Sequence, residues 1–174
     1  MFTIPAELLD ALRFAADQHQ YQRRGGYDPL PYINHIIKVT QVMVQVGREN
    51  DRDLLLATIL HDVVEDTEVT VDDLAARFGE KAAKTVGELT DDMSLSYDER
   101  KRLQVERAAS LSENARKIRI VDKASNIRDI FSYPVEWSWS KKEAYVENAQ
   151  AIVDQIRGSN PRIDNYFDEA VQFA

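Results

Sequence analysis

The segment 51–66, DRDLLLATILHDVVED, constrains the fold most strongly, because an almost unbroken apolar run leads directly into a group of titratable side chains. Its first aspartates suit a helix start, and the apolar residues after them predict a helix at the buried centre of the protein. A helix that continues to the end of the segment gathers four polar side chains along one stripe: His61, Asp62, Glu65 and Asp66. Such a group is costly at the end of a buried helix unless its charge is compensated, and a divalent cation is the simplest compensation.

A solvated helix terminus is the alternative interpretation of these residues, because Glu65 and Asp66 lead into a predicted loop. The helix dipole opposes this interpretation, since acidic side chains are unfavourable at a helix C-terminus. The local sequence therefore favours a functional cluster over a solvated helix end.

Helical spacing of apolar residues extends over most of the chain. It predicts helices over residues 5–20, 32–47, 51–66, 70–78, 80–90, 98–109, 112–131, 139–157 and 161–172. Between the first two, YQRRGGYDPLPY contains two glycines, two prolines and two arginines, which predicts a loop with a basic edge. Sustained period-2 alternation with hairpin signals is absent from the sequence, so an all-α fold is predicted. With only 6 Gly and 5 Pro in 174 residues, we expect residues 1–174 to form one compact multi-helix domain.

The charge balance bears on the class of ligand. The chain carries 22 basic and 30 acidic side chains, a formal net charge of −8. This balance argues against binding to nucleic acid or to an anionic membrane surface, because both favour a basic protein. A small anionic ligand remains compatible with it, provided that arginine and lysine side chains gather locally around the binding site.

The composition also limits the chemistry and the location of the protein. The sequence has no cysteine, which excludes disulfides, thiolate catalysis and cysteine-ligated metals. The N-terminal stretch shows no basic region followed by an apolar one, and no segment approaches the roughly 18 apolar residues of a membrane span. We therefore expect a cytoplasmic protein that does not contact membranes.

Other polar residues interrupt predicted helices. His35 lies among isoleucines, a setting in which a single histidine is more often a hydrogen-bonded core residue than a ligand. Asp122 also follows an apolar run, and an ion pair with Lys123 or Arg119 would account for it. It shares a helix face with an asparagine at position 126. His19 stands between two glutamines and is predicted to lie at the surface.

Taken together, one histidine, an adjacent histidine and aspartate, and a distant aspartate on separate predicted helices resemble the ligand set of the HD superfamily of metal-dependent phosphohydrolases. The order and spacing of five motifs narrow the resemblance: YINH, HDVVEDT, FGEKAAKTVGELTDD, ERKRLQVE and IVDKASNIRDI. This pattern resembles the hydrolase domain of the RelA/SpoT alarmone enzymes, and most closely the small single-domain alarmone hydrolases of the metazoan SpoT homologue type. The resemblance covers roughly residues 5–160.

The resemblance implies a fold, a reaction and a set of catalytic residues. The fold is a compact HD domain with a metal site between helices, and the reaction removes the 3′-pyrophosphate of guanosine tetra- or pentaphosphate. One Mn²⁺ per chain is the implied cofactor, with His35, His61, Asp62 and Asp122 as its ligands; two imidazoles and two carboxylates suit such a six-coordinate first-row ion. Glu65 and Asp66 match the catalytic pair that positions and deprotonates the attacking water.

The implied partner is a small purine nucleotide polyphosphate. Four residues match substrate-binding positions of the resembling enzymes: Arg24, Asn126, Lys141 and Tyr145. Lys123 and Arg128 are further basic candidates. The sequence departs from the family pattern at Gly25, Met93 and Tyr97, where related hydrolases often carry basic residues.

These departures leave the substrate open. An adenosine alarmone of the (p)ppApp type and the 2′-phosphate of NADPH are alternatives for the same site, and an ordinary nucleotide is a less favoured one. A non-catalytic nucleotide-binding module with the same fold is the alternative from a different functional class. Against it, all six metal-ligand and catalytic positions are intact in this sequence.

Overall fold

The computed structural model describes residues 5–25 and 29–174, and the regular secondary structure in these ranges is helical. Its elements are α1 (Ala6–Gln18), α2 (Ile33–Gln45), α3 (Arg52–Leu60), α4 (Val63–Asp66), α5 (Val71–Phe78), α6 (Glu80–Leu89), α7 (Tyr97–Arg107), the 3₁₀ turn η1 (Ala108–Ser110), α8 (Glu113–Ser132), α9 (Trp139–Ile156) and α10 (Pro161–Phe173). The described ranges contain no strand beyond an isolated bridge between Arg23 and Pro31, which confirms the all-α prediction. Residues 1–4 and 26–28, which belong to the predicted N-terminal stretch and loop, lie outside the described residues.

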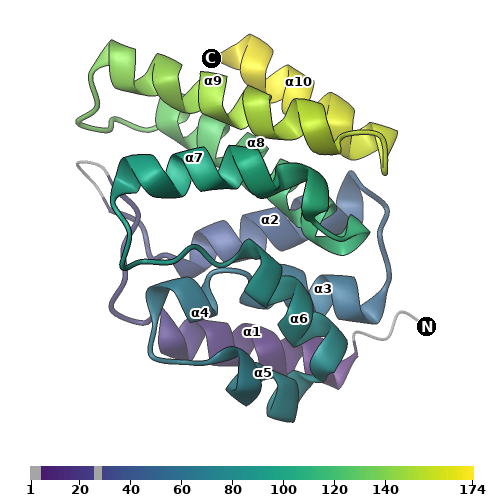
Figure 1. Ribbon diagram of the computed structural model, residues 1–174. Helices are drawn as coiled ribbons and strands as arrows, with labels where there is room; N and C mark the ends of the chain where they lie inside the picture. The colour runs from purple at the N-terminus through teal and green to yellow at the C-terminus, as the bar shows by residue number, and fades with distance from the viewer. Residues whose placement is uncertain (1–4, 26–28) are drawn as a thin grey trace.

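Two helices form the interior of the molecule. Every residue from Leu54 to Leu60 on α3 is buried, and this helix packs against α1, α2 and α6 (Figure 1). The long helix α8 packs against α2 and α6 on one side and against α9 and α10 on the other. The prediction of a central buried helix from the apolar run is therefore confirmed for α3.

Local sequence signals explain where several helices begin and end. The Asp51 side chain accepts a hydrogen bond from the Leu54 amide at 2.8 Å and caps the start of α3. Capping boxes begin α5, with Thr70 and Asp73, and α7, with Ser96 and Glu99. These caps satisfy amide groups that would otherwise lack partners in the first turn of each helix.

The predicted continuous helix over residues 51–66 is wrong at one point. The structure interrupts it at His61 and Asp62, with Asp62 at φ −101° and ψ −6°, before the short α4 begins. In an uninterrupted helix, adjacent side chains point in different directions, so His61 and Asp62 would diverge. The turn lets both face one point, and periodicity alone did not reveal it because the apolar pattern continues through Val63.

The interruption lies where three helices meet. His35 projects from α2, His61 from the end of α3, and Asp122 from the middle of α8. The contacts of α2 with α3 and α8 bring these side chains together. In the described ranges, no helix is both long and apolar enough to cross a membrane.

Truncation of the core of α3 should destabilise the whole fold. Leu56 is fully buried, so Leu56→Ala should lower the free energy of unfolding by about 2–5 kcal/mol, through lost burial and the cavity left behind. Urea unfolding followed by circular dichroism measures this loss. Leu9, which is 53% exposed on α1, provides the matched control: Leu9→Ala should change stability by no more than about 0.5 kcal/mol. Equal losses in the two variants would contradict the central role of α3.

Candidate metal centre and active site

Two histidines and an aspartate form a compact cluster of possible metal ligands. Ligand atoms of His35, His61 and Asp62 all lie within 4.8 Å of one another. The His61 Nε2 atom lies 3.1 Å from Asp62 Oδ2, and the His35 Nε2 atom lies 3.8 Å from the same oxygen. Asp122 approaches from α8, with its Oδ1 atom 3.2 Å from His35 Nε2 and 3.9 Å from His61 Nε2. The structure thus brings together all four residues that the sequence predicted as metal ligands.

The charges of this cluster perturb its own titration. Burial lowers the pKa of His61, but Asp62 and Asp122 raise it by more, so the net pKa lies well above the usual range. Burial raises the pKa of Asp122, yet the nearby imidazoles of His35 and His61 depress it well below normal. The pKa of Asp62 is likewise lowered overall, because the effect of His61 outweighs burial. The cluster therefore strongly favours a positive charge between its carboxylates. Either a proton or a bound cation can supply that charge.

Two imidazole nitrogens are placed to bind a metal. Within the part of the chain that the structure describes, the buried Nε2 atoms of His35 and His61 have no hydrogen-bond partner of proper geometry. The other nitrogen of His61, Nδ1, lies 2.8 Å from the Thr58 carbonyl oxygen, which accepts its hydrogen, so Nε2 is the nitrogen that faces the cluster and would bind a metal in place of a proton. Two imidazoles and two carboxylates are donors that divalent first-row metals accept. The residues present thus fit a divalent cation.

A neighbouring tyrosine orients one of these carboxylates. The hydroxyl of Tyr32, the residue preceding α2, donates to Asp62 Oδ2 at 2.7 Å. Burial and then the charge of Asp62 raise the Tyr32 pKa far above normal, so its hydroxyl keeps the proton that it donates. Tyr32 therefore fixes the Asp62 side chain without competing with it for positive charge.

Two further carboxylates flank the cluster on α4. The Asp91 amide donates to Glu65 Oε2 at 2.9 Å, and Gln22 donates to Asp66 Oδ2 at 2.8 Å. Desolvation raises the pKa of both carboxyl groups above the ordinary values, and the charge of Asp62 adds to each shift. A carboxylate with a raised pKa is a stronger base, so both groups suit proton abstraction from water.

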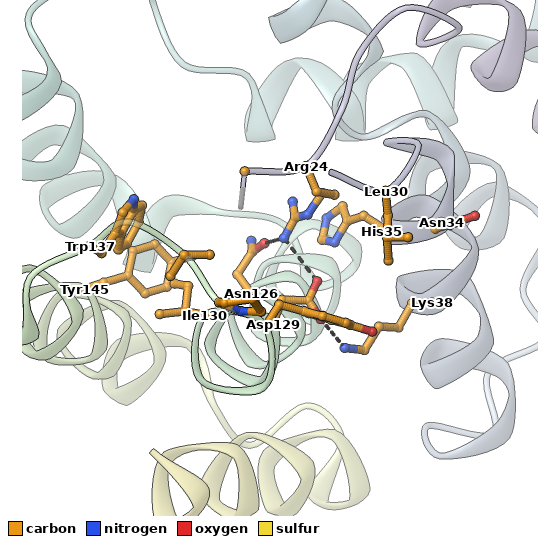
Figure 2. A pocket seen from close by; sticks show the side chains of 14 residues that line it. Arg24, Leu30, Asn34, His35, Lys38, Asn126, Asp129, Ile130, Trp137 and Tyr145 are labelled. Atoms are coloured by element: carbon orange, nitrogen blue, oxygen red, sulfur yellow. Dashed lines mark hydrogen bonds and ion pairs between the residues drawn. The ribbon is translucent and has the colours of Figure 1, made fainter. Parts of the chain in front are cut away.

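A pocket of about 620 Å³ opens beside the metal cluster, and His35 belongs to both (Figure 2). At this boundary, Arg24 donates to Asn126 Oδ1 at 2.6 Å, and Asn126 in turn donates to Asp122 Oδ1 at 2.7 Å. Much of the remaining wall is apolar or aromatic, including Ile130, Trp137 and Tyr145, and this volume is typical of small-ligand sites. A ligand in the pocket would therefore lie directly against the candidate metal centre.

The sequence profile of the HD domain family matches residues 11–130 of the chain. The chain belongs to the HD domain family. The matched range contains all four residues of the cluster, from His35 to Asp122.

Relatives of this HD-domain protein include two that carry the name guanosine-3′,5′-bis(diphosphate) 3′-pyrophosphohydrolase MESH1. The Drosophila melanogaster protein is 39% identical over 171 residues, which cover 97% of this chain and 96% of the relative. The Homo sapiens protein is 39% identical over 160 residues, covering 91% and 89% respectively. A solved structure of a metazoan orthologue of SpoT that hydrolyses ppGpp matches with a TM-score of 0.94 and 36% identity, over 99% of this chain and 97% of that one. These matches confirm the resemblance to the metazoan SpoT homologue type.

The predicted substrate-binding residues of this HD-domain protein fall into two groups. Arg24, Asn126 and Tyr145 line the pocket (Figure 2). Lys141 is exposed outside the lining, with its Nζ atom 4.2 Å from the centre of the Trp137 ring. The structure therefore joins three of the four to the pocket directly and the fourth through an aromatic wall residue.

The prediction that His19 lies at the surface is wrong. His19 is only 3% exposed, its ring lies 5.0 Å from that of Tyr32, and its Nδ1 atom lies 2.6 Å from Gln22 Oε1. Gln22 is the residue that holds Asp66, so His19 supports the flank of the metal cluster. The adjacent glutamines gave the segment a polar appearance, and no local signal indicated that the end of α1 faces the interior.

Lys38 is a residue of the site that the sequence did not indicate. Lys38 forms an ion pair with Asp129 at the pocket wall. Lys123, one of the further basic candidates, does not line the pocket: it is almost fully buried, and Gln104 accepts a hydrogen bond from it at 3.2 Å. Burial, with the charges of Lys101 and Arg119, lowers the pKa of Lys123 to about 7. The sequence did not predict the burial of Lys123, because it depends on contacts with α7.

Removal of the Tyr32 hydroxyl should weaken metal binding. Tyr32→Phe deletes the donor to Asp62 and leaves the ring in place, so affinity for Mn²⁺ should fall by about tenfold or more. Isothermal titration calorimetry on the chelator-treated protein measures this affinity. Tyr21, which is 86% exposed, gives the control Tyr21→Phe, for which we expect no change. Unchanged affinity in Y32F would show that the hydroxyl does not orient a metal ligand.

Neutralising Glu65 should stabilise the metal-free protein in a pH-dependent way. Because desolvation raises the Glu65 pKa in the folded protein, the folded state binds this proton more tightly than the unfolded chain does. Stability is then lost as pH rises from the unfolded pKa, about 4.3, through the folded one. Glu65→Gln removes this loss, so E65Q should be more stable than the wild type at pH 7. The difference should vanish below about pH 4, where Glu65 is protonated in both states.

Urea unfolding at a series of pH values, with a chelator present, measures this difference. A stability difference that does not vary with pH would contradict the proposed penalty for ionising Glu65.

Proposed function

We propose that this chain is a metal-dependent 3′-pyrophosphohydrolase of guanosine tetra- and pentaphosphate, which releases pyrophosphate and leaves GDP or GTP. The observation that carries the proposal is that the four candidate metal ligands adjoin a pocket large enough for a nucleotide. His35 belongs to both, and Asn126 in the pocket wall donates to the candidate ligand Asp122. The names of the relatives, over nearly the full chain, support the same reaction. The proposed unit of activity is a single hydrolase domain over residues 1–174, located in the cytoplasm.

The proposed cofactor is one Mn²⁺ ion per chain, with His35, His61, Asp62 and Asp122 as ligands. When bound, such an ion stabilises charge on the phosphoryl group and makes a water molecule acidic enough to attack at neutral pH. The donor set is compatible with this choice because it contains imidazole and carboxylate ligands and no thiolate. The Thr58 carbonyl and the Tyr32 hydroxyl would hold two of these ligands in orientation.

Glu65 and Asp66 are the proposed catalytic pair. Each is anchored by one hydrogen bond, from the Asp91 amide and from Gln22, so its second carboxylate oxygen is available to a water molecule. Burial moves the pKa of each carboxyl group closer to neutral pH, which makes the carboxylate a stronger base and favours removal of a proton from the attacking water. The water attacks the phosphorus attached to the 3′ oxygen. The bond between this phosphorus and the 3′ oxygen then breaks, which releases pyrophosphate.

The proposed substrate contacts are Arg24, Asn126, Lys141 and Tyr145. Arg24 lies over the Tyr32 ring at 5.5 Å, and its hydrogen bond to Asn126 directs it toward the pocket (Figure 2). Lys141 lies outside the pocket lining and contacts the ring of the lining residue Trp137. These cations provide the local positive charge that an anionic ligand requires in a protein of net charge −8.

The adenosine alarmones and the 2′-phosphate of NADPH are the second candidate substrates. The observation in their favour is Gly25, which lines the pocket where related hydrolases often carry a basic side chain. Met93 and Tyr97 are exposed and likewise supply no charge. A changed set of contacts around the same metal cluster would alter which nucleotide binds and leave the reaction the same.

A substrate panel tests the proposed function. The Mn²⁺-loaded protein is incubated with ppGpp, pppGpp, ppApp, pppApp and NADPH, and anion-exchange chromatography resolves the products. We expect pyrophosphate release, fastest from the guanosine compounds. Orthophosphate from NADPH alone would replace the proposal with the 2′-phosphatase, and the absence of all turnover would indicate a non-catalytic nucleotide-binding module.

Truncation of the proposed catalytic pair should separate chemistry from metal binding. Glu65→Ala and Asp66→Ala should each lower kcat by at least about 100-fold, because general base catalysis contributes factors of this size. Both variants should bind Mn²⁺ with near wild-type affinity, as measured by calorimetry. Wild-type turnover in both variants would exclude the pair from the reaction.

A further inference from the structure

Three residues of the pocket wall, Arg24, Lys38 and Asp129, form an ion-paired triad. Asp129 of α8 interacts with two cations: its Oδ1 atom lies 2.5 Å from Lys38 Nζ, and its Oδ2 atom accepts from Arg24 at 3.2 Å (Figure 2). Lys38 lies three residues after His35 on α2, and Asp129 lies three residues after Asn126 on α8, so each is one turn from the metal-centre boundary. The Lys38 side chain remains 34% exposed and is therefore accessible to a ligand.

The surroundings of this triad suit a nucleobase better than a phosphate group. A phosphate at Lys38 would also approach the Asp129 carboxylate, which repels it and already neutralises one of the two cations. The same pocket also has apolar and aromatic side chains in its wall, among them Leu30, Ile130 and Trp137. Such surfaces favour the flat face of a base by stacking and burial, while polar groups at the wall read its edge.

The order of donors and acceptors in the triad distinguishes the two purines. The Lys38 ammonium offers only donors, and the Asp129 carboxylate offers only acceptors, with lone pairs remaining on both oxygens. The Watson–Crick edge of guanine presents the O6 acceptor followed by the N1–H and N2–H donors, which complements a donor beside two acceptors. Adenine presents its N6 donor beside the N1 acceptor, so the same placement opposes donor to donor and acceptor to acceptor.

We propose that Lys38, held by Asp129, is a specificity-determining residue that selects guanine over adenine in the nucleotide pocket. This inference rests on the proposed function for its substrate, and it assigns the purine preference to a residue outside the motifs that carry the family resemblance. Lys38 would donate to O6, while Asp129 would accept from the N1–H and N2–H groups. Arg24 keeps Asp129 oriented from its other side.

The ratio of kcat/KM for ppGpp to that for ppApp tests the proposal. The wild type should favour ppGpp by roughly tenfold or more, the range expected for one well-formed pair of hydrogen bonds to a base. Lys38→Gln offers both a donor and an acceptor and should lower this ratio by about tenfold, while Lys38→Arg keeps donors only and should preserve the preference. Lys84→Gln, an exposed lysine of α6, controls for the loss of one positive charge and should keep the wild-type ratio.

The alternative outcomes overturn the inference. A wild type that hydrolyses both compounds equally would show that the triad does not read the base. A K38Q variant with the wild-type ratio, or with equal losses for both purines, would indicate that Lys38 acts without purine selectivity.

A binding measurement separates this inference from the proposed function. Guanosine and adenosine 3′,5′-bisphosphates carry no pyrophosphate and can be titrated into chelator-treated protein by calorimetry. The wild type should bind the guanosine compound roughly tenfold more tightly, and K38Q should lose that preference. If the wild type hydrolyses neither alarmone but shows this binding preference, the proposed function fails while the inference stands. If it hydrolyses both and binds both bisphosphates equally, the inference alone fails.

Discussion

The structure depends on one unfavourable requirement: a helix whose buried residues are almost all apolar must lead into a histidine and an aspartate that remain largely buried. Helix α3 supplies the centre of the core, and its final turn delivers His61 and Asp62 to a region with little access to water. Charge at that position is tolerated because α2 and α8 bring His35 and Asp122 to meet it. The packing of these helices and the electrostatics of the site are therefore parts of the same arrangement.

Much of the fold was accessible from the sequence because helix periodicity, caps and breakers act locally. The capping residues Asp51 and Thr70, for example, lie where polar side chains precede apolar periodicity. The break at His61 and Asp62 was not predicted, because it is a local deviation that tertiary contacts stabilise within an uninterrupted apolar pattern. The burial of His19 was missed for a related reason: its neighbours in sequence are polar, whereas its neighbours in space are Tyr32 and Gln22.

The site, like the fold, could be predicted where the signal is local and not where it depends on tertiary contacts. The metal-type cluster was predicted through motifs whose spacing is specific, and its residues do converge. The pocket wall was harder to predict, because the pairing of Lys38 with Asp129 joins residues that are 91 positions apart. Neither residue stands in an unusual local context, so only the packing of α2 against α8 reveals that they form one polar edge.

The wide separation of the cluster along the chain has a thermodynamic consequence. Its residues come from positions 35, 61, 62 and 122, so an unfolded chain cannot hold them around one ion without a large loss of conformational entropy. A cation that binds there must bind the native state far better than the unfolded one, and it shifts the folding equilibrium by mass action. The fraction of folded protein then depends on the concentration of free metal. Metal supply would therefore set the amount of folded protein as well as the rate of turnover.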